Sequence, residues 1–171
     1  MSDLASESGE SRRDAMPRPA ERQATIVRRA RADDIPAIVA MLADDPLGAT
    51  RETDAGFSGY KMAFEKISLD PNQMLVVGER AGEVVATMQL TLIPGMSRRG
   101  SSRALIEAVR VRGDQRGRGI GRWLIGWAID EARAAGCAII QLTSDRSRTD
   151  AHRFYASLGF EASHVGMKLM L

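Results

Sequence analysis

Apolar residues in the first part of the chain recur with the periods of regular structure. A short strand is expected around Thr25–Arg29. Two amphipathic helices should follow, because apolar residues then repeat at every third or fourth position. The residues with this spacing are Ile35, Ile38, Val39 and Leu42 in the first helix, and Phe57, Tyr60, Phe64 and Ile67 in the second. Asp33 and Asp34 are typical of a helix N-terminus, and Asp70-Pro71-Asn72 ends the second helix.

The middle of the chain changes to strand-like runs. Met74–Arg80 and Glu83–Leu92 are separated by Ala81-Gly82, which is typical of a hairpin turn. Arg103–Val111 is the next run, after a loop rich in Gly, Ser and Arg. From Gly119 onward the helical period returns, and it lasts to the glycine at position 136.

The C-terminal part contains two further strand patterns around one helix. Cys137–Thr143 is typical of a buried strand, and the apolar positions from Ala151 to Leu158 indicate a helix. Strict alternation of Val165, Met167, Leu169 and Leu171 then predicts a half-buried strand over His164–Leu171. Helical crossovers require parallel strands and the hairpin requires antiparallel ones, so the order of elements predicts an α/β (α+β) fold with a mixed central sheet flanked by helices.

Composition and charge narrow the class of protein. Residues 1–23 offer almost nothing to bury and are expected to be a disordered tail, which leaves 24–171 as one domain. A formal charge of +2 gives no sign of nucleic-acid binding, and no run approaches the ~20 apolar residues of a membrane span. With no signal-peptide segment, a cytoplasmic protein without a membrane partner is expected. The lone cysteine, Cys137, is interpreted as a core residue, and no cluster with metal-ligand spacing is present, so no metal is expected.

A turn rich in glycine and arginine joins the strand Arg103–Val111 to the next helix. Gly117, Gly119 and Gly121 allow the backbone close approach to a ligand, and three arginines add positive charge: Arg116, Arg118 and Arg122. The free N–H groups and the positive dipole at a helix start favour phosphate there. The turn lacks the Lys-Ser/Thr of a Walker loop and the G-x-G-x-x-G spacing of a dinucleotide fold. The alternative is a plain strand-to-helix loop.

Two motifs carry a resemblance to a known family. Arg116-Gly-Arg-Gly-Ile-Gly121 is similar to the (Q/R)-x-x-G-x-(G/A) signature of the GNAT (GCN5-related N-acetyltransferase) superfamily. The stretch from Ala151 to Phe160 resembles the family's A-x-x-F-Y-x-x-L-G-F segment, and the element order from Thr25 to Leu171 is similar as well. The resemblance implies the GNAT acyl-CoA N-acyltransferase fold, with the sheet splayed between its fourth and fifth strands. It also implies an N-acetyltransferase with acetyl-CoA as co-substrate, and a possible homodimer.

The same resemblance assigns roles to residues of this chain. The coenzyme A pyrophosphate would be held by main-chain amides of the turn, formed by Gln115, Arg116, Gly117, Arg118, Gly119, Ile120, Gly121 and Arg122. Val109, Arg110 and Val111 would lie on the strand that pairs with the pantetheine arm. Tyr155 would lie near the coenzyme sulfur. Arg148 stands where many relatives have an asparagine, and it is expected to reach the pantetheine or a phosphate instead.

Acetylation of an amine requires a proton acceptor and, for the leaving thiolate, a proton donor. Glu107 is the candidate base, because it is a carboxylate in an apolar strand; period-two alternation would place it on one face with Val109 and Val111, and burial would raise its pKa. The alternative is a salt bridge to Arg103 or Arg110. The hydroxyl of Tyr155 is the candidate acid, and the alternative is a core tyrosine. The main-chain N–H of Val109 is the expected oxyanion donor.

The sequence leaves the acceptor open. A primary amine of a small molecule, attacking acetyl-CoA directly in a ternary complex, is the favoured reading. The alternatives are a protein or peptide acetyltransferase, acting on lysine or an N-terminus, and a catalytically silent acetyl-CoA-binding regulatory module. The resemblance implies that two segments wall the acceptor side: Leu42–Ile67, around the first two helices, and Pro94–Ser102, the loop before the strand Arg103–Val111. Their charges give conflicting cues, because the first carries Asp44, Asp45, Glu52 and Asp54 and the second carries Arg98 and Arg99.

Overall fold

The computed structural model describes residues 24–44, 48–49, 52 and 56–171, so the expected N-terminal tail lies outside the described residues. A five-stranded sheet forms the centre, in the order β1-β2-β3-β4-β5. Its strands are β1 (Ile26–Arg29), β2 (Gln73–Arg80), β3 (Glu83–Ile93), β4 (Arg103–Val111) and β5 (Ile139–Leu142). Neighbouring strands are antiparallel except β4 and β5, which are parallel. The predicted mixed sheet is therefore confirmed.

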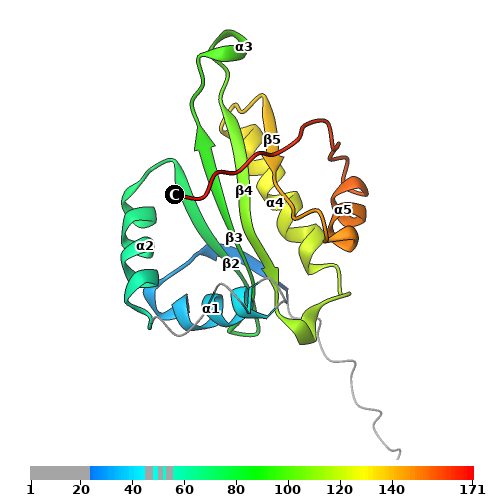
Figure 1. Cartoon of the computed structure of the whole chain (residues 1–171). Coiled ribbons are helices and arrows are strands. Elements are labelled where there is room, and N and C mark those ends of the chain that lie inside the picture. The colour runs from blue at the N-terminus through cyan, green and yellow to red at the C-terminus, as the bar shows by residue number, and fades with distance from the viewer. Residues whose placement is uncertain (1–23, 45–47, 50–51, 53–55) are drawn as a thin grey trace, which may run out of the picture.

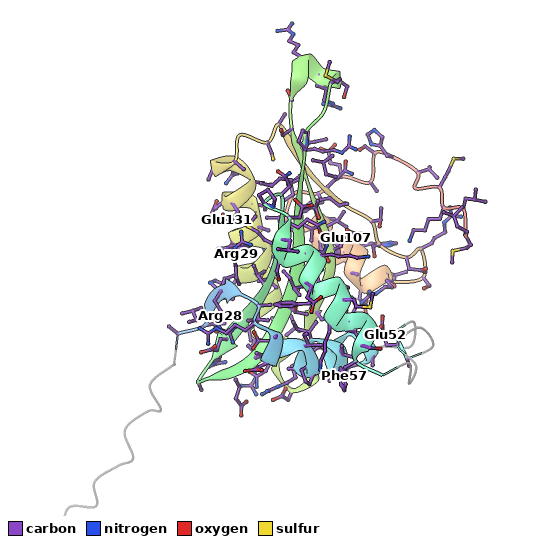
Figure 2. All side chains as sticks on the ribbon, turned by 90° about the vertical axis from the view of Figure 1, so that its left-hand side faces the viewer. Arg28, Arg29, Glu52, Phe57, Glu107 and Glu131 are labelled. Carbon is purple, nitrogen blue, oxygen red and sulfur yellow. The ribbon has the colours of Figure 1, made fainter. Side chains whose placement is uncertain are left out.

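Helices cover both faces of this sheet (Figure 1). The main ones are α1 (Ile35–Ala43), α2 (Ser58–Leu69), α4 (Ile120–Ala134) and α5 (Thr149–Ala156), with the short turns η1 (Ala32–Asp34), α3 (Ser97–Gly100) and η2 (Gly113–Gln115). Helix α4 packs on β3, β4 and β5, whereas α1 packs on β3 and β4 and α2 packs on β2. Figure 2 shows this layering through Glu131 of α4 and Glu107 of β4, which lie on opposite sides of the sheet. No helix in the described ranges has both the length and the apolar character needed to cross a membrane.

The main core lies between the sheet and α4. Met88 and Leu90 of β3 and Leu124 and Ile125 of α4 are fully buried there. They belong to alternate positions of the strand and to one stripe of the helix, as the apolar pattern predicts. Each large apolar side chain that is fully buried contributes about 1.5–3 kcal/mol to the free energy of folding. This layer is therefore the principal source of stability for β4 and its neighbours.

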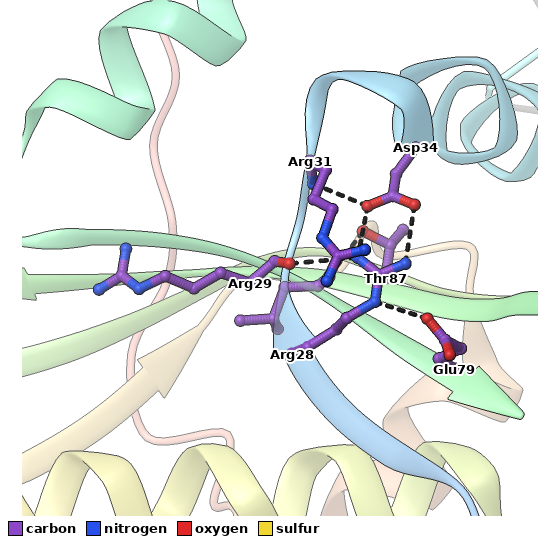
Figure 3. Close-up of polar contacts among 7 residues, drawn as sticks. Arg28, Arg29, Arg31, Asp34, Glu79 and Thr87 are labelled. Carbon is purple, nitrogen blue, oxygen red and sulfur yellow. Dashed lines mark hydrogen bonds and ion pairs between the residues drawn. The ribbon is translucent and has the colours of Figure 1, made fainter. Parts of the chain in front are cut away.

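A charged network fastens β1 to the start of α1 (Figure 3). The guanidinium of Arg28 donates to both carboxylate oxygens of Asp34, at 2.6 and 2.9 Å, and to Glu79 at 2.6 Å. Asp34 is only 7% exposed and also accepts the main-chain N–H of Arg31. These bonds lower the pKa of Asp34, with Arg28 as the largest cause. Asp34 was predicted as a helix N-terminal residue, and it does precede α1. Its side chain forms a salt bridge and makes no capping hydrogen bond to α1.

The predicted C-terminal strand is wrong. After α5, residues 161–171 adopt no regular secondary structure and are exposed. The alternating apolar side chains face solvent, with Met167 93% and Leu169 85% exposed. Alternation predicts which face a strand would bury, but a strand forms only where another strand supplies its hydrogen bonds. Among the described residues, none pairs with this segment.

The fourth strand contains a β-bulge that changes the direction of its side chains. Gln89 of β3 pairs with Glu107, whereas Thr87, two residues away, pairs with Arg110. Two residues, Ala108 and Val109, therefore lie opposite one, and Ala108 has a positive φ of 52°. The last residue that β4 pairs with β5 is Ile106, and only Glu107 separates it from the bulge. Beyond that point the two strands diverge, as the resemblance implied.

Candidate active site

A cavity of about 150 Å³ occupies the divergence between β4 and β5. Its walls come from the second half of β4, the end of β5 with the following loop, α5 and the C-terminal segment. The lining residues are Ile106, Glu107, Ala108, Val109, Arg110, Leu142, Thr143, Ser144, Asp145, Arg148, Ala151, Tyr155 and Lys168. The structure thus brings together five residues predicted from the sequence to take part in the reaction: Glu107, Val109, Arg110, Arg148 and Tyr155. We call this space the splay cavity.

Glu107 lies on the wall of the splay cavity but not in the environment that the sequence suggested. The bulge separates its face from that of Val109 and Val111, which pack against the core beneath α4. Glu107 instead shares a face with Arg110, because their partners Gln89 and Thr87 are two residues apart on β3. The carboxylate is exposed, so the expected burial is not found. Within the described ranges it makes no ion pair with Arg103 or Arg110, which leaves it available to a ligand.

Tyr155 enters the splay cavity from α5. Its ring makes edge contacts with Phe154 and Phe160, at centroid distances of 5.2 and 5.8 Å, which hold it in place. Burial raises the pKa of its hydroxyl, and the positive charges of Arg148 and Arg110 oppose that rise. The phenol therefore stays protonated at neutral pH, as a proton donor must. Tyr155 both packs against the core and lines the splay cavity, so a packing role does not exclude a role in proton transfer.

Charged side chains of both signs meet around this tyrosine. Arg110 and Arg148 lie close enough to influence its pKa, and Lys168 adds a further cation to the cavity wall. Asp145, in the loop after β5, adds a second carboxylate to the cavity lining, which also includes Glu107. Sequence reasoning did not single out Asp145 or Lys168. Asp145 lies in the loop shortly after β5, and a carboxylate just beyond a strand end was an available signal. Lys168 lies in the segment for which the sequence predicted a strand, and that prediction gave it no place in the site.

The glycine-rich turn leads from β4 into α4 with the backbone expected of a ligand cradle. Gly117 and Gly119 have positive φ values of 74° and 81°, which side chains rarely allow. A Cβ atom at either position would meet nothing within 4 Å, so the space beside the turn is open. At position 121 glycine is favoured by packing, because a Cβ atom there would lie 3.4 Å from the ring of Phe154. The turn therefore combines an open surface with a helix packed tightly against α5.

The polar side chains of the turn are mostly engaged with the protein itself. Arg116 donates to the carboxylate of Asp44 at 2.8 Å and so ties the turn to the end of α1. Arg122 donates to the Ser157 hydroxyl at 2.8 Å, and Gln115 donates to Asp114 at 2.8 Å. These contacts position the main chain of the turn, whereas Arg118 is exposed beside it. The positive charge expected from Arg116 is thus largely neutralised.

Among the described residues, neither of the two expected acceptor walls contributes to the lining of the splay cavity. In the first, Asp44 is paired with Arg116 and Glu52 accepts the hydroxyl of Tyr60. Asp45 and Asp54 lie outside the described residues. In the second, Arg98 and Arg99 have φ values of 52° and 60° and form the exposed tip of the β3–β4 hairpin, far from α5 (Figure 1). The arginines of this hairpin therefore do not line the splay cavity.

Comparison with protein families and curated proteins agrees with this geometry. The family described as "Acetyltransferase (GNAT) family" matches residues 35–160. An aminoalkylphosphonate N-acetyltransferase of Salmonella typhimurium is 30% identical over 138 residues, which cover 81% of this chain and 86% of the relative. An L-methionine sulfoximine/L-methionine sulfone acetyltransferase of Pseudomonas aeruginosa is 29% identical over 151 residues, with 83% and 86% covered.

Solved structures also share the fold. A protein from Bacillus halodurans described as a transcriptional regulator superposes with a TM-score of 0.82 and 43% identity, over 86% of this chain and all of that one. A putative acetyltransferase from Agrobacterium tumefaciens gives a TM-score of 0.77 and 26% identity, with 85% and 99% covered. The matches extend over the strands and helices that build the splay cavity.

Proposed function

This chain belongs to the GNAT family of acetyltransferases, and we propose that it transfers an acetyl group from acetyl-CoA to the primary amine of a small molecule that also carries an acidic group. The observation that carries the proposal is the splay cavity, where a free carboxylate, a protonated tyrosine and several cations meet. The amine attacks the thioester directly in a ternary complex. Cys137, the one cysteine of the chain, does not line the cavity, which argues against an acetyl-cysteine intermediate.

Glu107 accepts the proton of the attacking ammonium, directly or through a water molecule. Its exposure on the cavity wall gives an acceptor access to the carboxylate, and a carboxylate there also favours a cationic amine. Tyr155 donates a proton to the departing thiolate. The main-chain N–H of Val109 belongs to the bulge, where pairing with β3 is irregular, and in this proposal it stabilises the oxyanion.

The glycine-rich turn supplies the site for the coenzyme A phosphates. Its open surface above Gly117 and Gly119 fits a bulky anion, and the first N–H groups of α4 have no earlier carbonyl partners in the helix. β5 does not pair with β4 beyond Ile106, and in this proposal the pantetheine arm pairs with that edge. The carbonyls of Val109 and Val111 now accept hydrogen bonds from the guanidinium groups of Arg110 and Arg116, which would move aside for the arm. Arg148 lines the cavity between these two parts.

The acidic group of the acceptor is inferred from the cations of the splay cavity and from the relatives. Arg110, Arg148 and Lys168 surround the space that an acceptor would enter. Guanidinium groups bind carboxylates and phosphonates through paired hydrogen bonds. The acceptors named for the two curated relatives, an aminoalkylphosphonate and methionine derivatives, each combine an amine with an acidic group. A cavity of about 150 Å³ suits such a compound better than a peptide chain.

Titration calorimetry with acetyl-CoA, followed by a thiol-release assay, tests this function. The acceptor panel contains an aminoalkylphosphonate, methionine sulfone, an alkylamine of matched length without an acidic group, and a lysine peptide. We expect the two acidic amines to be acetylated with a kcat/KM at least ~10-fold higher than that of the plain alkylamine. Equal rates for all amines would contradict the acidic acceptor, and preference for the peptide would favour a protein acetyltransferase.

The phosphate cradle is tested by Gly119→Asp. The new side chain meets a positive φ and places a negative charge where phosphate would bind, so acetyl-CoA affinity should fall by ~100-fold or more. Gly82→Asp is a matched control, because that glycine also has a positive φ and open surroundings but lies in the β2–β3 hairpin turn. If Gly119→Asp leaves the affinity for acetyl-CoA unchanged, the phosphates of the coenzyme do not bind at this turn.

Homodimerisation remains a prediction from the family. Sedimentation of the full chain at micromolar concentration measures it directly. A single species of twice the chain mass of 18.6 kDa would confirm a dimer, and a species of 18.6 kDa would contradict it.

A further inference from the structure

The C-terminal segment approaches the splay cavity closely. A Cβ atom on Gly166 would lie 3.9 Å from the Thr143 methyl group, so the segment passes over the end of β5. In Figure 1 it crosses in front of β5 and β4, and in Figure 2 it lies on the same side of the sheet as Glu107. Two residues after Gly166, Lys168 forms part of the cavity wall.

Lys168 is chemically a primary amine beside the acetyl-transfer site. It lines the same cavity as Glu107 and Tyr155, the residues to which the proton transfers are assigned. A lysine side chain extends roughly 6 Å from its Cα atom, which is enough to cross a cavity of this size. The chain has only two other lysines, Lys61 and Lys66. Both are exposed on α2 and neither lines the cavity.

We propose that Lys168 is itself an acetyl acceptor, modified in cis within the splay cavity. The inference rests on the proposed function, because it uses the same acetyl-CoA and the same proton transfers. Glu107 takes a proton from the lysine ammonium, and the neutral Nζ attacks the thioester carbonyl carbon. The N–C bond forms and the C–S bond breaks, and the thiolate leaves as coenzyme A after it takes a proton from Tyr155. The acetylated nitrogen then loses its second proton to solvent, Glu107 releases its proton to solvent, and solvent reprotonates Tyr155. The net products are Nε-acetyl-Lys168, coenzyme A and one proton.

Tethering favours this reaction over acetylation of the other lysines. An amine attached to the wall of the site reacts at an effective concentration far above that of a protein in solution. The segment has no regular secondary structure and its side chains are exposed, so Lys168 can adjust its position at little cost. Acetylation removes a positive charge from the cavity and thereby changes its attraction for an acidic acceptor.

The experiment is incubation of the full chain with acetyl-CoA alone, followed over time by intact-mass and peptide mass spectrometry. We expect Lys168 to be acetylated at least ~10-fold faster than Lys61 and Lys66, with a first-order rate constant that does not change with protein concentration. Glu107→Gln should slow this reaction by at least ~10-fold, and a good acceptor amine should inhibit it. Lys168→Arg should abolish the fast acetylation, whereas Lys61→Arg should leave it unchanged.

Thiol release with the acceptor panel, measured on the same preparation, separates the two proposals. Turnover of a small amine without acetylation of Lys168 overturns this inference and leaves the proposed function standing. Equal acetylation of all three lysines, unaffected by Glu107→Gln, is uncatalysed chemistry and overturns it as well. A rate that rises with protein concentration contradicts modification in cis. Binding of acetyl-CoA with neither turnover nor acetylation overturns both.

Discussion

The two halves of β4 belong to one strand and have different surroundings. Residues 103–106 pair with β3 on one edge and with β5 on the other, and Ala104 and Ile106 are buried at 0% and 2% exposure. Residues 107–111 pair with β3 alone and begin with the bulge at Ala108. We call these the closed half and the open half.

The difference shows how one strand serves both stability and chemistry. In the closed half every backbone group has a partner strand, and the side chains on one face pack under α4. In the open half β5 no longer pairs with β4, and the bulge turns Glu107 and Arg110 to the same face. The open half still has a defined position because β3 holds its other edge. Substitutions in the two halves should therefore separate loss of stability from loss of activity.

The largest expected effect is on stability, from the core beside the closed half. Leu90 pairs across from Ile106 and is fully buried. Leu90→Ala removes this packing and should lower the free energy of unfolding by about 2–5 kcal/mol, measured by urea denaturation. Met62→Ala, at a position that is 59% exposed on α2, is the control and should change it by less than about 0.5 kcal/mol. A small effect of Leu90→Ala would show that the closed half does not depend on this core.

The next effect is on activity, from the first residue of the open half. Glu107→Gln removes the proposed base and should lower kcat by ~100-fold or more, equivalent to about 2.7 kcal/mol of transition-state stabilisation. The free energy of unfolding and the affinity for acetyl-CoA should stay close to those of the parent chain, because the Glu107 side chain is exposed. Glu65→Gln, an exposed substitution on α2, is the matched control. A parent-like kcat would assign the base to another group, such as Asp145.

Tyr155 should have a smaller catalytic effect. Tyr155→Phe should reduce kcat by roughly 10-fold, because a thiolate is already a good leaving group and needs limited help from an acid. Burial raises the pKa of Tyr155 above the ordinary value of about 10 for a tyrosine. The phenol therefore keeps its proton through the neutral range, and the activity of the parent should fall only at a pH above that value. The alkaline fall of kcat in the parent should disappear in Tyr155→Phe. A fall that remains in the variant would belong to a different acid.

The smallest effect is expected at the bulge. Ala108 has a positive φ, which costs an alanine about 1 kcal/mol, and glycine adopts that φ without strain. Ala108→Gly should therefore change the free energy of unfolding by no more than about 0.5 kcal/mol, since the greater freedom of glycine in the unfolded chain offsets the relief. Ala104→Gly, in the closed half of the same strand, should cost about 1 kcal/mol or more. Equal costs at both positions would contradict a strained bulge.

Much of the local structure could be predicted from the sequence. The bounds of β4 are those expected, and α4 begins just after Gly119, as its helical period indicates. The turn glycines have the positive φ values that motivated their selection. These features depend on residues close together in sequence, where periodicity and glycine content are informative.

The errors occur where distant parts of the chain meet. The strand predicted over His164–Leu171 lacks a partner among the described residues, and alternation cannot reveal that. Period-two counting placed Glu107 beside Val109, whereas the extra residue of the bulge reverses the later side chains. Both errors follow from hydrogen bonding to another strand, which a pattern along one segment does not contain.

The sequence by itself determined the family, the order of the main strands and helices up to α5, and the two motifs that surround the site. It did so because local spacing of apolar residues and glycines limits the backbone directly. Only the tertiary structure decided that Glu107 faces the same side as Arg110 and that Lys168 reaches the wall of the splay cavity. Those placements follow from strand register, a bulge and an unpaired C-terminal segment, and each depends on contacts between residues far apart in the chain.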